Sequence, residues 1–146
     1  MKSVSKKIEK LNIAVKVFDD QIKVENKLLQ SSKDQLNTMN ALLKDIIETL
    51  NNSGIMPSGV VSGGTLSNHN KYRKMLTSNK VVLEQNIFAI ELQVKGHSKK
   101  LRDLIAKKTA AESLIKKLLI QKERADDKAQ QQVAELMHTV KSFNQD

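Results

Sequence analysis

Carboxylate and imidazole side chains are the groups in this sequence that could carry out acid–base or metal chemistry. Asp126 and Asp127 form an adjacent acidic pair, but neighbouring residues of a helix point about 100° apart and cannot act on one proton. The histidines His69, His97 and His138 are separated by long stretches of chain, whereas a zinc site gathers its ligands into one cluster. We therefore expect no catalytic centre and no metal site.

Sequence motifs of common enzymes and cofactor sites are also missing. The chain has no cysteine and contains none of the patterns HExxH, GxSxG or CxxC. Gly63-Gly64 does not belong to a phosphate-binding loop, because no GxxxxGK pattern surrounds it. A helical rod would also offer no concave pocket for a substrate. The sequence thus predicts a protein that is not an enzyme and that uses no cofactor.

Basic side chains are the most abundant charged groups, and they are unevenly distributed. The formal net charge is +9, and residues 51–146 carry sixteen basic and nine acidic residues. Such a surface could contact nucleic-acid phosphates, but no aromatic residues are interleaved for base stacking. A solvated helix face that docks on acidic protein surfaces is the favoured interpretation. A generic basic coiled-coil scaffold, or a nucleic-acid-associated helical hairpin, stays open as the alternative.

These side chains must be positioned by long helices, because apolar residues recur with coiled-coil spacing. Residues 65–143 contain no proline and only one glycine, Gly96. Spacings of three and four residues alternate along this stretch, which indicates a helix that buries a narrow seam against another helix. The apolar positions of the predicted seam are Leu76, Leu83, Ile87, Ile90, Val94, Leu101, Leu104, Ala111, Ile115 and Leu118. His97 also falls at a position of this predicted seam.

The same repeat runs through residues 3–50. One set of positions seven residues apart is entirely apolar, from Ile8 to Leu50, and a second set from Val4 to Ile46 is interrupted by Glu25 and Ser32. A repeat held this long favours a coiled coil. Glu25 and Ser32 could form a partly wet patch that fixes the register, or a loosened region that opens or twists during function.

Between the two helices, residues 51–64 contain four of the five glycines and the only proline, Pro57. This composition breaks helices and favours turns, so we expect a flexible loop that serves as a mobile tip or a small binding element. Thr65 would then cap the second helix. The prediction is a single all-α domain over residues 1–146, in which two long helices form an antiparallel coiled-coil hairpin.

Placing Leu50 beside Leu66 sets an expected register for this hairpin. Val4 then lies near Glu112, and the acidic pair Asp19-Asp20 lies near His97, where Lys95, Lys99 and Lys100 could neutralise it. The second helix is longer than the first, so residues 113–143 would have no partner in the chain. Their apolar stripe changes phase after Ala125, and such an exposed stripe marks an interaction surface.

Two short motifs resemble those of the flagellar type III export protein FliJ family. The first is Lys71-Tyr72-Arg73-Lys74-Met75 with Gln85 downstream, which is similar to the start of the second helix in that family. The second is the basic run that leads from Gln121 through Asp126-Asp127 to Ala129. The architecture of most of the chain, a heptad helix, a glycine-containing loop and a longer second helix, is also similar to that of the family.

The resemblance implies a stalk-like component of the flagellar protein export apparatus, in which the end carrying both termini binds the export ATPase hexamer. Other surfaces would engage the export-gate membrane protein and export chaperones, with no nucleic acid involved. The ATPase-facing segment would be residues 113–143. Its expected contact residues are Ile115, Leu118, Arg124, Asp126, Asp127 and Lys128, and those of the export-gate face are Tyr72, Met75, Gln85 and Lys95.

The N-terminus is basic, but no run of seven or more apolar residues follows it. We therefore expect neither a signal peptide nor a transmembrane span. Together with the resemblance, this predicts a cytoplasmic protein that associates with the inner face of the cell membrane only through its partners.

Overall fold

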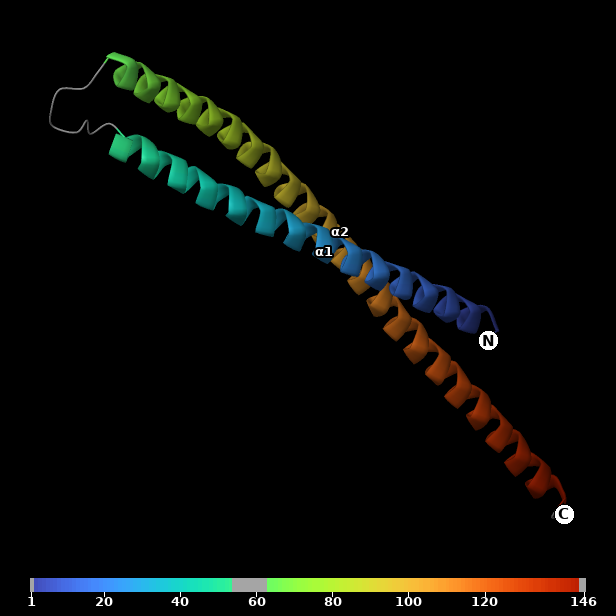
Figure 1. Ribbon diagram of the computed structural model, residues 1–146. Coiled ribbons are helices and arrows are strands. Elements are labelled where there is room, and N and C mark those ends of the chain that lie inside the picture. The colour runs from blue at the N-terminus through green and yellow to red at the C-terminus, as the bar shows by residue number, and fades with distance from the viewer. Residues whose placement is uncertain (1, 54–62, 145–146) are drawn as a thin grey trace. The chain divides into compact units, whose positions relative to one another are not determined.

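The computed structural model describes residues 2–53 and 63–144, and these residues form two long helices. Helix α1 spans Lys2–Ser53 and helix α2 spans Gly63–Asn144, drawn from blue to green and from green to red in Figure 1. Both are rich in lysine and leucine, which are strong helix formers. The predicted all-α architecture of two long, mutually packed helices is confirmed, and no strand occurs in the described part of the chain.

The connection between the helices is shorter than the sequence predicted. Helix α1 continues past Leu50 to Ser53, and α2 already begins at Gly63. Thr65 therefore lies inside the first turn of α2 rather than at the position before the helix, because composition locates helix ends only to within a few residues. The predicted flexible tip around Pro57 falls in residues 54–62, which lie outside the described residues.

The chain divides into two compact units, and both helices contribute to each of them. In unit 2, Val24–Leu101, the second half of α1 packs antiparallel against the first half of α2. Leu76, Ile87 and Ile90 are buried there, so the seam begins near Leu76 as predicted. No large side chain among the described residues is fully buried, as expected for a seam only two helices wide.

Unit 1 combines Met1–Lys23 of the first helix with Arg102–Asp146 of the second. Val4, Leu104 and Ala111 form its buried positions. An ion pair joins Lys108 of α2 to Asp19 of α1, and Lys108 also lies 3.6 Å from Glu112 on its own helix. These two carboxylates raise the pKa of the Lys108 ammonium, and the hydrogen bond that Lys108 donates to Asp19 is the largest cause.

The predicted register is wrong. Asp19 pairs with Lys108 rather than lying near His97, and Lys100 pairs with Glu25 rather than with Asp19. The pairing is thus shifted along α2 by roughly two to three helical turns. The prediction failed because it aligned the two helix ends at the loop, whereas a seven-residue apolar repeat accepts several alignments equally well.

The shift also moves the start of the unpaired segment. Ile115, Leu118 and Ala125 are half-buried on the seam, so the prediction that residues 113–143 lack a partner is wrong for its first part. Val4 does not lie near Glu112 in this alignment; its neighbours Lys2, Ser5 and Lys6 line a surface hollow together with Lys122. From residue 126 to 144 every residue is exposed, and we call this segment the overhang.

Candidate functional site

The overhang is a helix that exposes a continuous apolar side. Its large apolar residues are strongly exposed, and Phe143 at 84% and Leu136 at 68% are the two most exposed large apolar residues in the described part of the chain. Spacings of three and four residues keep them on neighbouring positions of the helix surface. The residues of this apolar side are Val133, Leu136, Met137, Val140 and Phe143.

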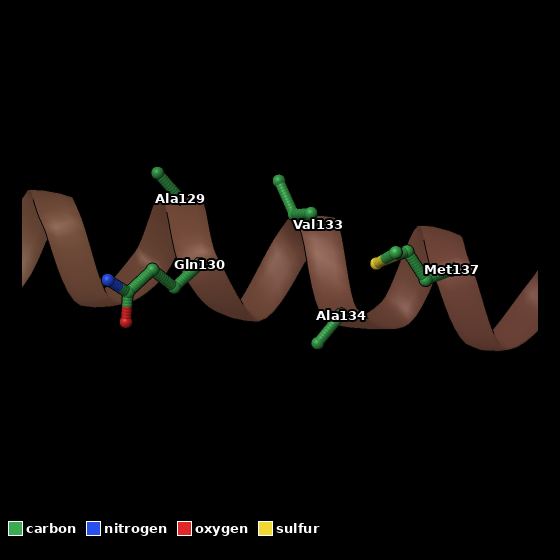
Figure 2. Close-up of a pocket in the computed structure, with 5 residues that line it drawn as sticks. All are labelled: Ala129, Gln130, Val133, Ala134 and Met137. Carbon is green, nitrogen blue, oxygen red and sulfur yellow. The ribbon is translucent and has the colours of Figure 1, made fainter.

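A shallow hollow on the overhang is lined by five residues, all from α2. Figure 2 shows that Ala129 and Val133 project to the same side of the helix, one turn apart. Ala129 is small and its neighbour Val133 is branched, so the surface offers a notch rather than an enclosed cavity. Because one helix supplies all the walls, this surface suits a partner's side chains better than a small ligand.

The residues predicted to face an export ATPase fall into two groups in the structure. Arg124, Asp126, Asp127 and Lys128 are exposed where the paired seam ends and the overhang begins. Ile115 and Leu118 are half-buried on the seam of unit 1. Both therefore lie on the paired part of the hairpin, and their role as ATPase contacts stays a prediction. The sequence placed them in the unpaired segment only because its register was wrong.

The four residues predicted for the export-gate face are all exposed along α2 in unit 2. Tyr72 and Lys95 are separated by roughly 35 Å of helix at 1.5 Å per residue, so the structure does not gather the set into one compact site. The set also omits three strongly exposed apolar residues of the same helix, Val82, Phe88 and Leu92. The seven-residue spacing of Met75 and Val82 is a signal in the sequence that could have pointed to them.

A second feature is a buried polar cluster formed by Glu25, His97 and Lys100. Glu25 is only 4% exposed, among the most buried residues of the chain. Its carboxylate lies 2.9 Å from His97 Nδ1 and 3.1 Å from Lys100 Nζ, both on α2. Ser32 is also buried. The predicted wet patch at these two positions is therefore wrong, while the predicted seam position of His97 is confirmed.

The cluster holds Glu25 in its ionised form. The hydrogen bond from His97, followed by that from Lys100, lowers the pKa of Glu25 below its ordinary value of 4.5. An ionised carboxylate can only accept hydrogen bonds, so His97 Nδ1 must carry the proton that it shares with Glu25 Oε2. Gly96 precedes this histidine without breaking α2, and a Cβ atom there would meet nothing within 4 Å.

The lowered pKa of Glu25 predicts a loss of stability in acid. The folded chain holds the Glu25 proton less tightly than the unfolded chain, so its contribution is present above about pH 4.5 and is lost as the pH falls through the folded pKa. The thermal midpoint should therefore fall as the pH is lowered below about 4.5. In a Glu25→Gln variant this fall should be smaller, as measured by circular dichroism. The exposed Glu91→Gln variant is the matched control, and an equal acid response in all three proteins would contradict the prediction.

Residues 2–53 and 63–144 contain no group of three histidine or acidic side chains that could hold a metal ion. Neither helix, over its described length, has a segment long and apolar enough to cross a membrane. The overhang and the buried polar cluster are thus the two features that call for a functional explanation. Comparisons of the chain with protein-family models, with curated proteins and with solved structures find no match.

Proposed function

We propose that this protein is a non-enzymatic, stalk-like component of the flagellar type III export apparatus. Its overhang binds the export ATPase hexamer, and the outer surface of unit 2 engages the export-gate membrane protein and export chaperones. In this role the chain sits on the cytoplasmic side and reaches the inner face of the cell membrane only through its partners. The observation that carries the proposal is the overhang, an apolar helical surface that the chain itself leaves uncovered.

The exposed area supports a docking role on energetic grounds. Five large apolar side chains on one helix cost free energy when they face water, roughly 1.5–3 kcal/mol each relative to full burial. A partner that encloses the helix would recover part of this energy, as an axial cavity of a ring-shaped assembly could. The resemblance of the motifs around Tyr72 and Asp126 to the export family supplies the identity of that partner.

The distribution of charged residues in unit 1 would orient the overhang as it approaches a partner. The paired part of unit 1, residues 1–23 and 102–125, carries thirteen basic and six acidic residues. The overhang that follows begins with Asp126 and Asp127 and carries three acidic and two basic residues. A partner whose entrance is acidic and whose interior is apolar would accept the overhang first and the basic shaft behind it.

A truncated chain that ends at Ala125 tests the proposal. Binding to a purified flagellar export ATPase, assembled as a hexamer with a non-hydrolysable nucleotide, is measured by biolayer interferometry. We expect the full chain to bind, and the truncated chain to lose at least about 100-fold in affinity as the apolar contacts disappear. The helical signal per residue and the thermal midpoint of the truncated chain should be unchanged, because every residue from 126 to 144 is exposed among the residues that the structure describes.

Three outcomes separate the alternatives. Equal binding by both chains would show that the overhang is not the contact surface. Failure of the full chain to bind the ATPase would overturn the export role itself. In that case, the protein's affinity for DNA or RNA would be measured by gel shift at several salt concentrations. A logarithm of affinity that falls linearly with the logarithm of salt concentration would support the nucleic-acid-associated hairpin instead.

A further inference from the structure

The seven-residue apolar repeat does not by itself choose how the two helices align. If α1 slid past α2 by seven residues, apolar seam positions would again meet apolar seam positions. The ion pair of Asp19 with Lys108 adds little selectivity, because both side chains are partly exposed and water can replace the contact. Some other feature must therefore select the observed alignment.

Glu25 provides that selection, because its carboxylate is buried and must be paired. If α1 slid by seven residues in one direction, Glu25 would lie opposite Ile90 and Gln93 in place of His97 and Lys100. Ile90 is buried and offers no hydrogen-bond donor, and Gln93 offers only a neutral amide donor. The carboxylate would therefore lose the hydrogen bond from His97 and the ammonium of Lys100, and no cation would replace them. This alignment is strongly disfavoured.

Sliding in the other direction has a different result. Glu25 would then lie opposite Leu104 and Lys107, which stand seven residues after His97 and Lys100. Lys107 could replace Lys100 as the ammonium partner, but Leu104 could not replace His97 as a donor. His97 alone therefore distinguishes the observed alignment from this one.

We propose that the Glu25, His97 and Lys100 cluster is a register lock that confines the hairpin to one of several alignments permitted by its apolar seam. Each residue of the lock has a distinct part. Glu25 penalises every alignment that leaves its carboxylate unpaired, and His97 excludes the alignment in which Lys107 takes the place of Lys100.

The lock also sets how much of α2 is left unpaired. Both helices are continuous between the units, so a slip at Glu25 changes the pairing at the other end by the same seven residues, or about 10 Å of helix. On the proposed export function, this would change the length of the overhang offered to the ATPase. The lock is therefore a device that defines the reach of the docking segment.

Cysteine cross-linking tests the lock directly, because the chain has no cysteine of its own. Leu42 of α1 and Val82 of α2 line one surface groove, so a Leu42→Cys, Val82→Cys pair reports the observed alignment with a short bismaleimide. Pairing Leu42→Cys with Ala89→Cys, seven residues further along α2, reports the slip that places Glu25 opposite Leu104. Pairing Leu42→Cys with Met75→Cys, seven residues before Val82, reports the slip that places Glu25 opposite Ile90.

In the otherwise unchanged chain, we expect only the pair with Val82 to form an intramolecular cross-link in high yield. A His97→Leu variant should add the cross-link to Ala89 at a yield within about threefold of the first, but not the cross-link to Met75. A Glu25→Leu variant should allow both slipped cross-links. Circular dichroism checks that each variant stays helical. Met39→Leu, a seam substitution outside the cluster, should give the same cross-links as the otherwise unchanged chain.

The proposal is overturned if the His97→Leu and Glu25→Leu variants both give the cross-link to Val82 alone. It is equally overturned if the slipped cross-links already form in the unchanged chain. Should Glu25→Leu fail to fold, the directional result from His97→Leu decides, because that substitution leaves the buried carboxylate paired with Lys100. ATPase binding is not part of the measurement, so its failure would leave the lock unaffected.

Discussion

A Leu136→Glu variant is expected to lose at least about 100-fold in affinity for the export ATPase hexamer while keeping the thermal midpoint of the unchanged protein. Leu136 is 68% exposed in the middle of the apolar side of the overhang. Enclosing a leucine in an apolar site contributes roughly 1.5–3 kcal/mol, and a charge forced into the same site adds a desolvation cost. Because none of the residues in 2–53 and 63–144 covers this position, folding should not be affected.

The matched control for this variant is Leu92→Glu. Leu92 is also exposed on α2, but it lies in unit 2. The same chemical change there should alter ATPase affinity by less than about threefold. Titrations by biolayer interferometry and melting curves by circular dichroism provide the two readouts. If Leu136→Glu and Leu92→Glu weaken binding equally, the effect is one of net charge, and the overhang is not the docking surface.

The largest expected effect on stability comes from Ile90→Ala. Ile90 is 6% exposed on the seam of unit 2, and shortening a buried isoleucine to alanine removes apolar contacts and leaves a cavity. We expect a loss of about 2 kcal/mol in the free energy of unfolding, at the low end of values for core positions because a two-helix seam can relax around the gap. Urea unfolding followed by circular dichroism measures this loss.

Phe88→Ala is the control, two residues away on the same helix. Phe88 is larger than Ile90 but is 63% exposed, so its removal should change the free energy of unfolding by less than about 0.5 kcal/mol. If Phe88→Ala destabilised the protein as much as Ile90→Ala, the face of α2 that carries Phe88 would be buried in solution. The assignment of the seam, and with it the register, would then be wrong.

Much of the fold could be predicted from periodicity alone. The alternation of three and four residues identified the seam of α2 from Leu76 onward and placed His97 on it, and the structure confirms both. The segment rich in glycine and proline separated the two helices. Such features are local, because the position of a residue on a helix surface depends only on its spacing from its neighbours.

The candidate sites were less predictable. Asp126, Asp127 and Lys128 could be placed at the start of an unpaired segment, but Ile115 and Leu118 were assigned to that segment wrongly. The burial of Glu25 was also missed, because a lone glutamate in a seam looks like a defect until its partners are known. Those partners, His97 and Lys100, are more than seventy residues away in the chain.

The sequence by itself thus determined two coiled-coil helices, which side of each is apolar, and a second helix too long for the first to cover. Only the tertiary structure decided the register, the first unpaired residue and the pairing of Glu25 with His97 and Lys100. The physical reason is that a seven-residue repeat looks the same after a slip of seven residues. Distinguishing one alignment from the next requires contacts between residues distant in the chain, and a buried charge is the contact that separates these alignments most strongly.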